Sequence, residues 1–540
     1  MDLEPLIEAL SRPTAYPGGA DHVVVHQTHI SAVFLAGEHA YKIKKPVNLG
    51  FLDFTTLERR RHFCHEEVRL NRRLAPDVYL GVVPIRADAA GALHVESAGD
   101  TDEPAGSEAV VIEWAVRMRR LPDEATLDHR LQDGQDVGPW MRVLGQRLAE
   151  FHARADRGAH IAHFGSYEVV ERNALENFDQ SARQVGTTVS AAVFERLRGL
   201  TEGELARHRP LIEARATRGV PCDTHGDLRP GHVYLFPEQA PPANLVIVDC
   251  IEFNERFRFS DPVADIAFLA MGLQRAGHAE LAAAFCEAYV HAAGDDEGRR
   301  LLPFYIAYRA AVRGKVDGMQ TFNHEIPERD RAIALAKARG FWLLGLGALE
   351  APQRRPCLLV IVGLPGTGKS TLAADLAARA GCEVIRSDVV RKELAGAAPA
   401  ASQAAPFGEG IYTPEWTERT YDECRRRAEQ LLFEGRRVIV DASFNSEAQR
   451  QTILEAAIHW GVPPLILECT ADAAVVRARL AARTGDASDA DWQIYEQAAA
   501  RWQPPGPLAA RHWVTIDTSA EREAALQQAL GALKRRGLWE

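Results

Sequence analysis

The feature that most constrains the fold is the stretch GLPGTGKS, residues 363–370, which directly follows the apolar run CLLVIV, residues 357–362. It fits the pattern G-x-x-x-x-G-K-[ST], in which a glycine-rich turn joins a strand to a helix. The next segment, STLAADLAARAG, has helical periodicity. With the strand–helix alternation further along the chain, this order predicts a mainly parallel sheet with crossover helices. A plain glycine turn between a strand and a helix is the alternative.

Each position of this loop has a physical role in holding a nucleoside triphosphate. Gly363, Gly366 and Gly368 allow the backbone N–H groups to face phosphate oxygens at the positive end of the following helix. Lys369 is expected to contact the β- and γ-phosphates, and the Ser370 hydroxyl to ligate Mg²⁺. The predicted nucleotide-binding residues of the loop are Gly363, Leu364, Pro365, Gly366, Thr367, Gly368, Lys369, Ser370 and Thr371.

Three further segments carry polar residues suited to the same site. RRVIVDASF ends a buried strand at Asp441, which would hold the metal through water or, alternatively, cap the next turn. Asp388 ends the strand CEVIRSD and would accept a proton from an acceptor hydroxyl, although Ser387 or Asp388 also suits a helix N-cap. Arg479 and Arg483 share a helix face and would stabilise a transferring phosphoryl group, the alternative being two solvated arginines.

The first half carries a second phosphate-handling pattern of a different design. HGDLRPGH has the spacing of the catalytic loop H-x-D-x-x-x-x-N, with His225, Asp227 and, at the metal position, His232 in place of asparagine. Asp227 would orient and deprotonate an acceptor hydroxyl, and His225 would brace the loop. Asp249 ends the apolar strand in NLVIVDCIEFN and is suited to hold Mg²⁺.

An upstream strand supplies positive charge for this second site. Lys42 and Lys44 of AYKIKKPV share one strand face, and we favour Lys44 as the partner of the α- and β-phosphates. The helix-like segment FCHEEVRLNRRLAP offers Glu66 and Glu67 as ion-pair partners, of which we favour Glu67; exposed helix charges are the alternative. No G-x-G-x-x-G loop precedes the strand, and Mg²⁺ prefers oxygen ligands to the nitrogen of His232, so this site predicts weaker or slower nucleotide chemistry.

The sequence pattern changes at LEAPQRRPC, residues 349–357, where prolines bracket a short polar run. We predict the domain boundary there. Period-two strand patterns dominate a predicted sheet region of about 1–120, and helical periodicity dominates about 121–350. Residues 351–540 form the predicted strand–helix region. Within it, the Ala- and Pro-rich segment 395–414 is expected to form a loop over the site.

Composition places the chain among soluble globular proteins. The hydrophobic content is 46%, no apolar run reaches the roughly 18 residues that span a bilayer, and the start MDLEPLIEAL resembles no secretion signal. The formal net charge of −11 disfavours general nucleic-acid or membrane binding. Because the eight cysteines include no CxxC pair, neither a disulfide framework nor a zinc site is indicated. We therefore predict a cytoplasmic protein without a membrane partner.

Residues 356–540 resemble the P-loop kinase family that includes gluconate-type, zeta-toxin-like and polynucleotide 5′-kinase enzymes. The resemblance rests on GLPGTGKST, RSDVVRKEL, GIYTPEWTERTY and VIVDASF. It implies a kinase that acts on a hydroxyl group of a small molecule or a nucleotide, without choosing between these acceptors.

Residues 1–350 resemble the aminoglycoside phosphotransferase-like branch of the protein-kinase fold. The matching segments are LAEFH, HGDLRPGHV, VIVDCIEF and DPVADIAFL. The resemblance implies that Asp227 is the catalytic base, that Asp249 is a Mg²⁺ ligand and that EWAVRM near Val116 is an adenine-binding hinge. The expected fold is thus an α+β, two-lobed protein-kinase-like domain followed by an α/β P-loop domain, a fusion that resembles a bacterial family of bifunctional ATP-binding proteins.

These patterns predict a bifunctional, ATP- and Mg²⁺-dependent phosphotransferase that moves the γ-phosphoryl group to a hydroxyl of a small molecule. The P-loop half is the better-supported catalyst. One alternative is a nucleotide-regulated switch or binding protein. Another is a 5′-polynucleotide kinase: the acidic charge counts against it, whereas RRRAEQLLFEGRR offers a local basic surface.

Overall fold

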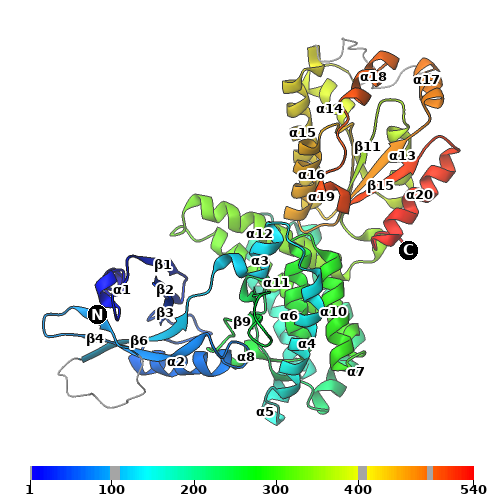
Figure 1. Ribbon diagram of the computed structural model, residues 1–540. Helices are drawn as coiled ribbons and strands as arrows, with labels where there is room; N and C mark the ends of the chain where they lie inside the picture. Colours follow the sequence, from blue (N-terminus) through cyan, green and yellow to red (C-terminus); the bar gives the residue numbers. More distant parts are fainter. Residues whose placement is uncertain (1–2, 98–109, 399–409, 483–489) are drawn as a thin grey trace. The chain divides into compact units, whose positions relative to one another are not determined.

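The computed structural model describes residues 3–97, 110–398, 410–482 and 490–540 (Figure 1). Its contacts divide the chain into two compact units that interleave along the sequence. The first comprises Met1–Val170, Arg209–Leu273 and Ala279–Leu302, and the second comprises Glu171–His208, Gln274–His278 and Pro303–Glu540.

The first unit begins with an antiparallel sheet in the order β1-β2-β3-β6-β4-β5. Its strands are β1 Val23–Gln27, β2 Ser31–Ala36, β3 His39–Lys44, β4 Tyr79–Ala87, β5 Leu93–Val95 and β6 Val110–Arg119. Gly37, with φ +57°, makes the tight turn between β2 and β3. Helix α2 (Leu57–Asn71) starts at Thr56, whose hydroxyl accepts a hydrogen bond from the Arg59 N–H, and packs on β4 and β6 (Figure 1).

The first unit also contains one helix before this sheet and several short strands and helices after it. The helices are α1 Leu3–Leu10, α3 Leu127–Gln132, α4 Gly138–Arg154, α5 Ala159–Phe164, α8 Glu255–Arg258, α9 Pro262–Arg275 and α10 Ala279–Ala293. The short strands are β7 Cys222–Asp223, β8 Val233–Leu235, β9 Leu245–Ile247 and β10 Phe259–Ser260. In the β8–β9 ladder Val233 pairs with Ile247, so the residue before β8 lies close to the residues after β9.

The second unit contains the predicted parallel sheet, with the strand order β12-β13-β11-β14-β15. The strands are β11 Cys357–Val362, β12 Glu383–Arg386, β13 Arg437–Asp441, β14 Pro464–Thr470 and β15 Trp513–Asp517, and every pair is parallel. This confirms the expected α/β architecture of the C-terminal region. The register matters for the site, because Ile361 beside Asp441 brings the end of β13 next to the glycine loop after β11.

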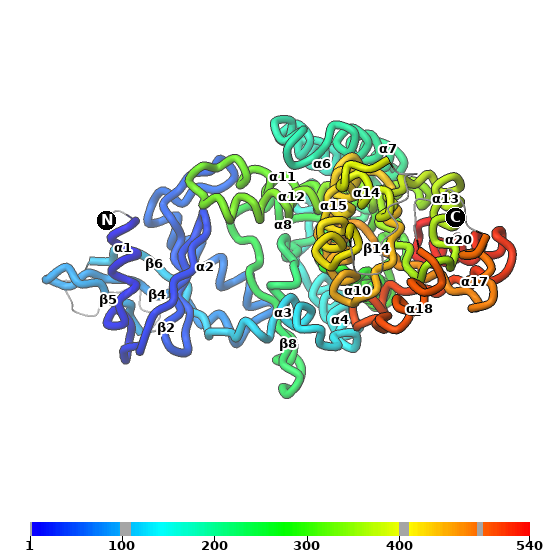
Figure 2. Tube along the Cα trace, turned by 90° about the horizontal axis from the view of Figure 1, so that it is seen from above, coloured from blue at the N-terminus to red at the C-terminus, as the bar shows by residue number. Residues whose placement is uncertain are grey.

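Helices cover both faces of this sheet. They are α13 Lys369–Ala380, α14 Ser387–Leu394, α15 Pro414–Phe433, α16 Glu447–His459, α17 Ala473–Ala482, α18 Trp492–Ala500, α19 Pro507–Arg511 and α20 Arg522–Arg535. Figure 2 shows α15 on one side of β14 and α13 with α20 on the other. The sheet therefore has two separate cores, one on each face.

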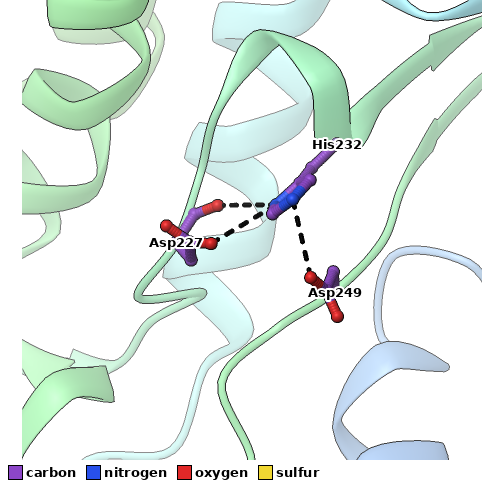
Figure 3. A group of neighbouring side chains, drawn as sticks. All are labelled: Asp227, His232 and Asp249. Atoms are coloured by element: carbon purple, nitrogen blue, oxygen red, sulfur yellow. Dashed lines mark hydrogen bonds and ion pairs between the residues drawn. The ribbon is translucent and has the colours of Figure 1, made fainter. Parts of the chain in front are cut away.

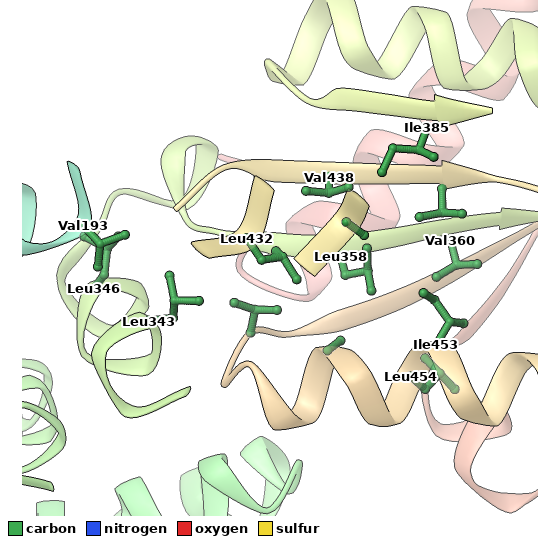
Figure 4. Close-up of a cluster of buried hydrophobic side chains, with 14 of the residues drawn as sticks. Val193, Leu343, Leu346, Leu358, Val360, Ile385, Leu432, Val438, Ile453 and Leu454 are labelled. Atoms are coloured by element: carbon green, nitrogen blue, oxygen red, sulfur yellow. The ribbon is translucent and has the colours of Figure 1, made fainter. Parts of the chain in front are cut away.

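The core on the α15 face extends into helices that precede the P-loop region in sequence. These helices are α6 Tyr167–Ser181, α7 Ala191–Thr217, α11 Leu302–Thr321 and α12 Glu328–Leu349. Val193, Leu343 and Leu346 join Leu358 and Val438 of the sheet in one buried cluster (Figure 4). Hydrophobic packing thus crosses the position where the sequence pattern changes, while the predicted domain limits at 350 and 351 remain a prediction.

Helix α12 alone, among the described residues, has the length and composition of a candidate membrane span, and half of its most apolar window is buried inside the protein. Trp342, Leu343 and Leu346 account for much of this apolar character, because they belong to the core just described. A core helix of a soluble protein has the same composition. The cytoplasmic location remains a prediction.

Candidate functional site

The glycine loop between β11 and α13 has the backbone conformation that phosphate binding requires. Gly363, Gly366 and Gly368 have φ values of +136°, +79° and +89°, which side-chain-bearing residues rarely adopt. Within the loop, the Lys369 Nζ donates to the Leu364 carbonyl oxygen at 2.9 Å. The loop is thus held in shape from within, and the Lys369 ammonium lies against it.

A cavity of about 780 Å³ opens beside this loop. Its walls include Lys369 and Ser370 from the loop, Asp388 from α14 and Asp441 from the end of β13. Residues from α15, from the segment before α16 and from α16 itself also line it: Thr417, Glu418, Tyr421, Asp422, Arg425, Asn445 and Gln449. With Pro365, Gly366, Gly368 and Thr371, which also line it, the structure brings eight of the predicted site residues to one cavity.

Ser370 and Asp441, the two residues predicted to hold Mg²⁺, both contact the side chain of Arg386. Arg386 donates from Nη2 to the Ser370 Oγ at 3.3 Å, and its Nε lies 3.6 Å from the Asp441 Oδ2. Burial raises the pKa of Asp441, while Lys369 and Ser370 act in the opposite direction. Sequence reasoning did not select Arg386. The sequence signal that could have identified Arg386 is its position at the end of β12, because the parallel register places it beside Asp441.

Arg479 reaches the glycine loop from α17. Its Nη2 donates to the Thr518 carbonyl oxygen at 2.7 Å. A Cβ atom added at Gly368 would lie 3.6 Å from the Arg479 Nη1, and this buried Nη1 donates to no acceptor in the described parts of the chain. An orphaned guanidinium N–H beside a glycine loop fits an anionic ligand such as a phosphate group. Arg483 lies outside the described residues, as do residues 399–409 of the expected loop.

The first unit holds the second set of predicted residues. Both lysines of β3 contact the same glutamate: the Nζ atoms of Lys42 and Lys44 lie 2.8 Å from the Glu67 Oε1 and Oε2, respectively. Glu66 instead pairs with Arg69 at 2.8 Å on the exposed side of α2. The two lysines differ in their other partner. The Lys42 Nζ lies 2.9 Å from the Asp249 Oδ1, and Lys44 pairs with Glu252.

These ion pairs control the protonation of the buried groups. Burial opposes the charge of Lys42, but Asp249 and Glu67 outweigh it and raise the pKa of Lys42 well above its usual value. Burial likewise opposes ionisation of Glu67, and the two lysines still lower its pKa. The result is a buried network of ionised groups in which both Glu67 oxygens face lysines.

The loop HGDLRPGH is braced by residues far away in sequence. The carboxylate of Asp265 in α9 accepts hydrogen bonds from the His225 N–H at 2.6 Å and the Gly226 N–H at 2.8 Å. The Nε2 of His225 donates to the Val248 carbonyl oxygen at 3.0 Å. Burial lowers the pKa of His225 to about 4, so the ring is neutral at physiological pH. His225 thus lies where a loop-bracing residue is expected, and Asp265 is a brace that the sequence analysis did not select.

Asp227 and His232 of this loop lie close to Asp249, which follows β9 (Figure 3). One donor atom from each lies within 4.8 Å of the others. Asp249 has a left-handed backbone with φ +65°, which is uncommon for a residue other than glycine. Arg229, another residue that sequence reasoning missed, donates from Nη2 to the His232 Nε2 at 2.8 Å and pairs with the Asp227 Oδ2 at 2.8 Å.

Comparison with known proteins agrees with the fold of the C-terminal region. Residues 358–505 match a family model described as an AAA domain. With the glycine loop and the parallel sheet, this match indicates that residues 358–505 form a P-loop domain. The chain as a whole belongs to the family of the Mycobacterium tuberculosis protein Rv2004c and the Mycobacterium bovis protein Mb2027c. It is 32% identical to each over 508 residues, which cover 94% of this chain and 94% of each relative, and both carry the description "Uncharacterized protein".

Solved structures similar to part of the chain include two kinases. A gluconokinase from Sinorhizobium meliloti has 18% identity and a TM-score of 0.26 and covers 34% of this chain and 94% of its own. A sugar kinase from Janibacter has 20% identity and a TM-score of 0.27 and covers 33% of this chain and 95% of its own. With TM-scores this low, neither similarity bears on the choice of substrate.

Proposed function

We propose that the P-loop region transfers the γ-phosphoryl group of ATP to a hydroxyl group of a small molecule. The observation that carries this proposal is the single cavity lined by Lys369, Ser370, Asp388 and Asp441. Phosphoryl transfer needs positioning and charge stabilisation more than covalent chemistry by the protein. Cationic, hydroxyl and carboxylate groups around one cavity supply these requirements.

Each of these residues has a role that follows from its place. The N–H groups of the loop and Lys369 hold the β- and γ-phosphates, for which Lys369 exchanges its contact with the Leu364 carbonyl. When bound, Mg²⁺ neutralises phosphate charge, with Ser370 and Asp441 as the groups that hold it. Asp388 accepts the proton of the acceptor hydroxyl.

The far wall of the cavity suits an acceptor that donates hydrogen bonds. The Asn445 Oδ1 is buried and accepts no hydrogen bond from the described residues, although Asn445 lines the cavity. A buried acceptor atom without a donor is costly, and a hydroxyl group of the substrate satisfies it. Gln449 and Tyr421 add polar groups to the same wall.

A screen of hydroxyl compounds with the full-length protein, ATP and Mg²⁺ tests this proposal. We expect Lys369→Ala to remove most ATP turnover, because it deletes the phosphate-binding cation. Asp388→Asn should lower kcat by about 10²–10⁴-fold, the usual contribution of a general base. Asp422→Asn is the matched control, since Asp422 lines the same cavity and should affect mainly KM. Turnover that survives Lys369→Ala unchanged but disappears with Asp227→Ala would contradict the proposal.

We further propose that residues 1–350 adopt the two-lobed protein-kinase-like fold and hold a second phosphotransferase site. The supporting observation is the contact of the strand lysine Lys42 with Asp249, a metal-type aspartate 207 residues away. In this proposal Lys42 contacts the nucleotide phosphates, whereas Lys44, enclosed by Glu67 and Glu252 and 1% exposed, stabilises the site. The sequence pattern favoured Lys44 because strand periodicity cannot separate two residues on one face.

Because Lys369→Ala is expected to disable the P-loop site, the ATP turnover that remains in this variant measures the activity of the second site. We expect Asp227→Asn and Asp249→Asn to remove that remainder and Lys45→Met to leave it unchanged. Nucleotide binding without transfer to any acceptor in the screen would instead favour the regulatory alternative. Transfer to 5′-hydroxyl oligonucleotides in a gel assay would favour the polynucleotide alternative.

A further inference from the structure

The trio Asp227, His232 and Asp249 differs from an ordinary magnesium site in one donor. The His232 Nε2 lies 3.5 Å from the Asp249 Oδ2, and the His232 Nδ1 lies 3.8 Å from the Asp227 Oδ2. Figure 3 shows the imidazole ring between the two carboxylates. The site therefore presents one ring nitrogen together with carboxylate oxygens.

The hydrogen bonds of His232 determine which ring nitrogen carries the proton and which carries the lone pair. The Nδ1 lies 2.9 Å from the Asp227 carbonyl oxygen, which can only accept, so the Nδ1 carries the proton. The Nε2 is therefore the lone-pair nitrogen, and it faces Asp249. A backbone bond to the opposite ring nitrogen is the arrangement that orients metal-binding histidines in general.

Cationic side chains already occupy the three donors. Arg229 contacts the His232 Nε2 and the Asp227 Oδ2, both at 2.8 Å, and Lys42 contacts the Asp249 Oδ1 at 2.9 Å. All three donors thus attract positive charge from outside the trio. Arginine and lysine can exchange such contacts for phosphate oxygens, which would leave the three donors to a metal ion.

We propose that this trio binds a divalent first-row transition-metal ion, with Mn²⁺ as the probe, in preference to Mg²⁺. Mg²⁺ binds oxygen ligands in strict octahedral geometry and loses its waters reluctantly. Transition-metal ions bind an imidazole nitrogen more readily, and Mn²⁺ also retains the carboxylate preference that the two aspartates require. In the P-loop cavity the residues proposed to hold a metal, Ser370 and Asp441, have oxygen donors, so the proposal gives one chain two sites of different metal preference.

This metal site is part of the proposed second phosphotransferase site, and the proposal rests on that function. Its test, however, does not depend on phosphoryl transfer. Free Mn²⁺ is titrated by its EPR signal against full-length protein that carries Asp441→Asn, without nucleotide, and then displaced with Mg²⁺. We expect one Mn²⁺ site that Mg²⁺ displaces poorly and that Asp249→Asn abolishes. Failure of catalysis with intact Mn²⁺ binding would count against the function alone.

The substitution His232→Asn restores an oxygen donor and gives the decisive comparison. We expect it to weaken Mn²⁺ binding by about tenfold or more, since loss of even a ligand's supporting partner costs that much, and to make Mg²⁺ an effective competitor. His160→Asn is the control, because His160 is an exposed histidine of the same unit that pairs with Glu255. Circular dichroism of each variant checks folding.

Pulsed EPR of the bound Mn²⁺ reports the ligand directly, without any substitution in the trio. A coordinated imidazole nitrogen produces ¹⁴N modulation, which we expect in the Asp441→Asn protein. Absence of that modulation, equal Mg²⁺ competition in the His232→Asn and unaltered trios, or absence of any bound Mn²⁺ would each overturn the proposal.

Discussion

Arg479 donates to the Thr518 carbonyl oxygen at 2.7 Å, and the Thr518 hydroxyl in turn donates to the Thr367 carbonyl oxygen at 2.6 Å. Helix α17, the residue after β15 and the glycine loop are thereby linked. The second arm of the Arg479 guanidinium remains buried beside Gly368 with no acceptor in the described residues. The hydrogen bond to Thr518 thus orients the Arg479 side chain towards the glycine loop.

The first prediction follows from this contact. Arg479→Gln should lower kcat for ATP-dependent transfer by about 10²–10³-fold, the usual loss when one donor to developing charge is removed. Arg477→Gln is the control, because the Arg477 guanidinium lies over the Trp492 ring, 4.3 Å from its centroid. Steady-state kinetics decide the matter: equal effects of the two substitutions would show that Arg479 has no special role.

The second prediction concerns the buried ion network of the first unit. Lys44→Met leaves Glu67 and Glu252 without their shared cation and should lower the free energy of unfolding by about 3–5 kcal/mol. Adding Glu252→Gln should recover part of that loss, since it removes the carboxylate that loses its ion-pair partner, whereas Glu67 keeps its contact with Lys42. Lys45→Met, at the next position, should have little effect. Urea unfolding measures all four proteins; no recovery in the double variant would mean that the loss is not electrostatic.

The third prediction tests the core that crosses the sequence boundary. Leu346→Ala should cost about 2–5 kcal/mol, because Leu346 is fully buried between α12 and the sheet region. Ile333→Ala on the same helix should change stability by no more than about 0.5 kcal/mol, since Ile333 is 45% exposed.

The stability of this core is measured by thermal unfolding of the protein with and without ATP, the nucleotide that the second unit is proposed to bind. A Leu346→Ala protein in which ATP-sensitive unfolding is unchanged would show that α12 does not support the P-loop region. We also expect residues 351–540 expressed alone to be poorly soluble, because they expose the sheet side of this core.

The fourth prediction is a pH dependence of stability. The pKa of His225 falls from 6.5 to about 4 on folding, because burial disfavours the charged ring. Between these values the unfolded chain binds more protons, so stability is complete above pH 6.5 and decreases as the pH falls towards 4. At pH 5 the loss is roughly 2 kcal/mol relative to pH 7.5.

His225→Asn should reduce this pH dependence by the same roughly 2 kcal/mol. The measurement is the difference in unfolding free energy between pH 7.5 and pH 5, with the exposed His160→Asn as control. An unchanged difference in His225→Asn would mean that other groups cause the acid sensitivity.

Local sequence patterns predicted most of the secondary structure near both sites. The alternation in DHVVVH and AYKIKK corresponds to β1 and β3, and the apolar runs before the glycine loop and before Asp441 correspond to β11 and β13. Patterns failed for β5 and β15. Three residues are too few to show a period in β5, and four of the five residues of β15 are partly or fully exposed.

Residues joined by long-range contacts were beyond the reach of these patterns. Arg386 and Arg229 are close to predicted site residues in the sequence. Only the fold shows that Arg386 contacts Ser370 and that Arg229 contacts His232. Asp265 lies 40 residues from His225 along the chain but accepts its backbone hydrogen bond. Ionic side chains have no periodicity that reveals such partners.

The sequence by itself determined the glycine loop, the strand before it and the helix after it, because backbone conformation there depends on local residue types. Only the tertiary structure decided that Lys42 rather than Lys44 meets Asp249, and that one core joins α12 to the parallel sheet. Such choices depend on which distant segments approach each face of an element. Two lysines on one strand face are equivalent until a residue 207 positions away comes within 2.9 Å of one of them.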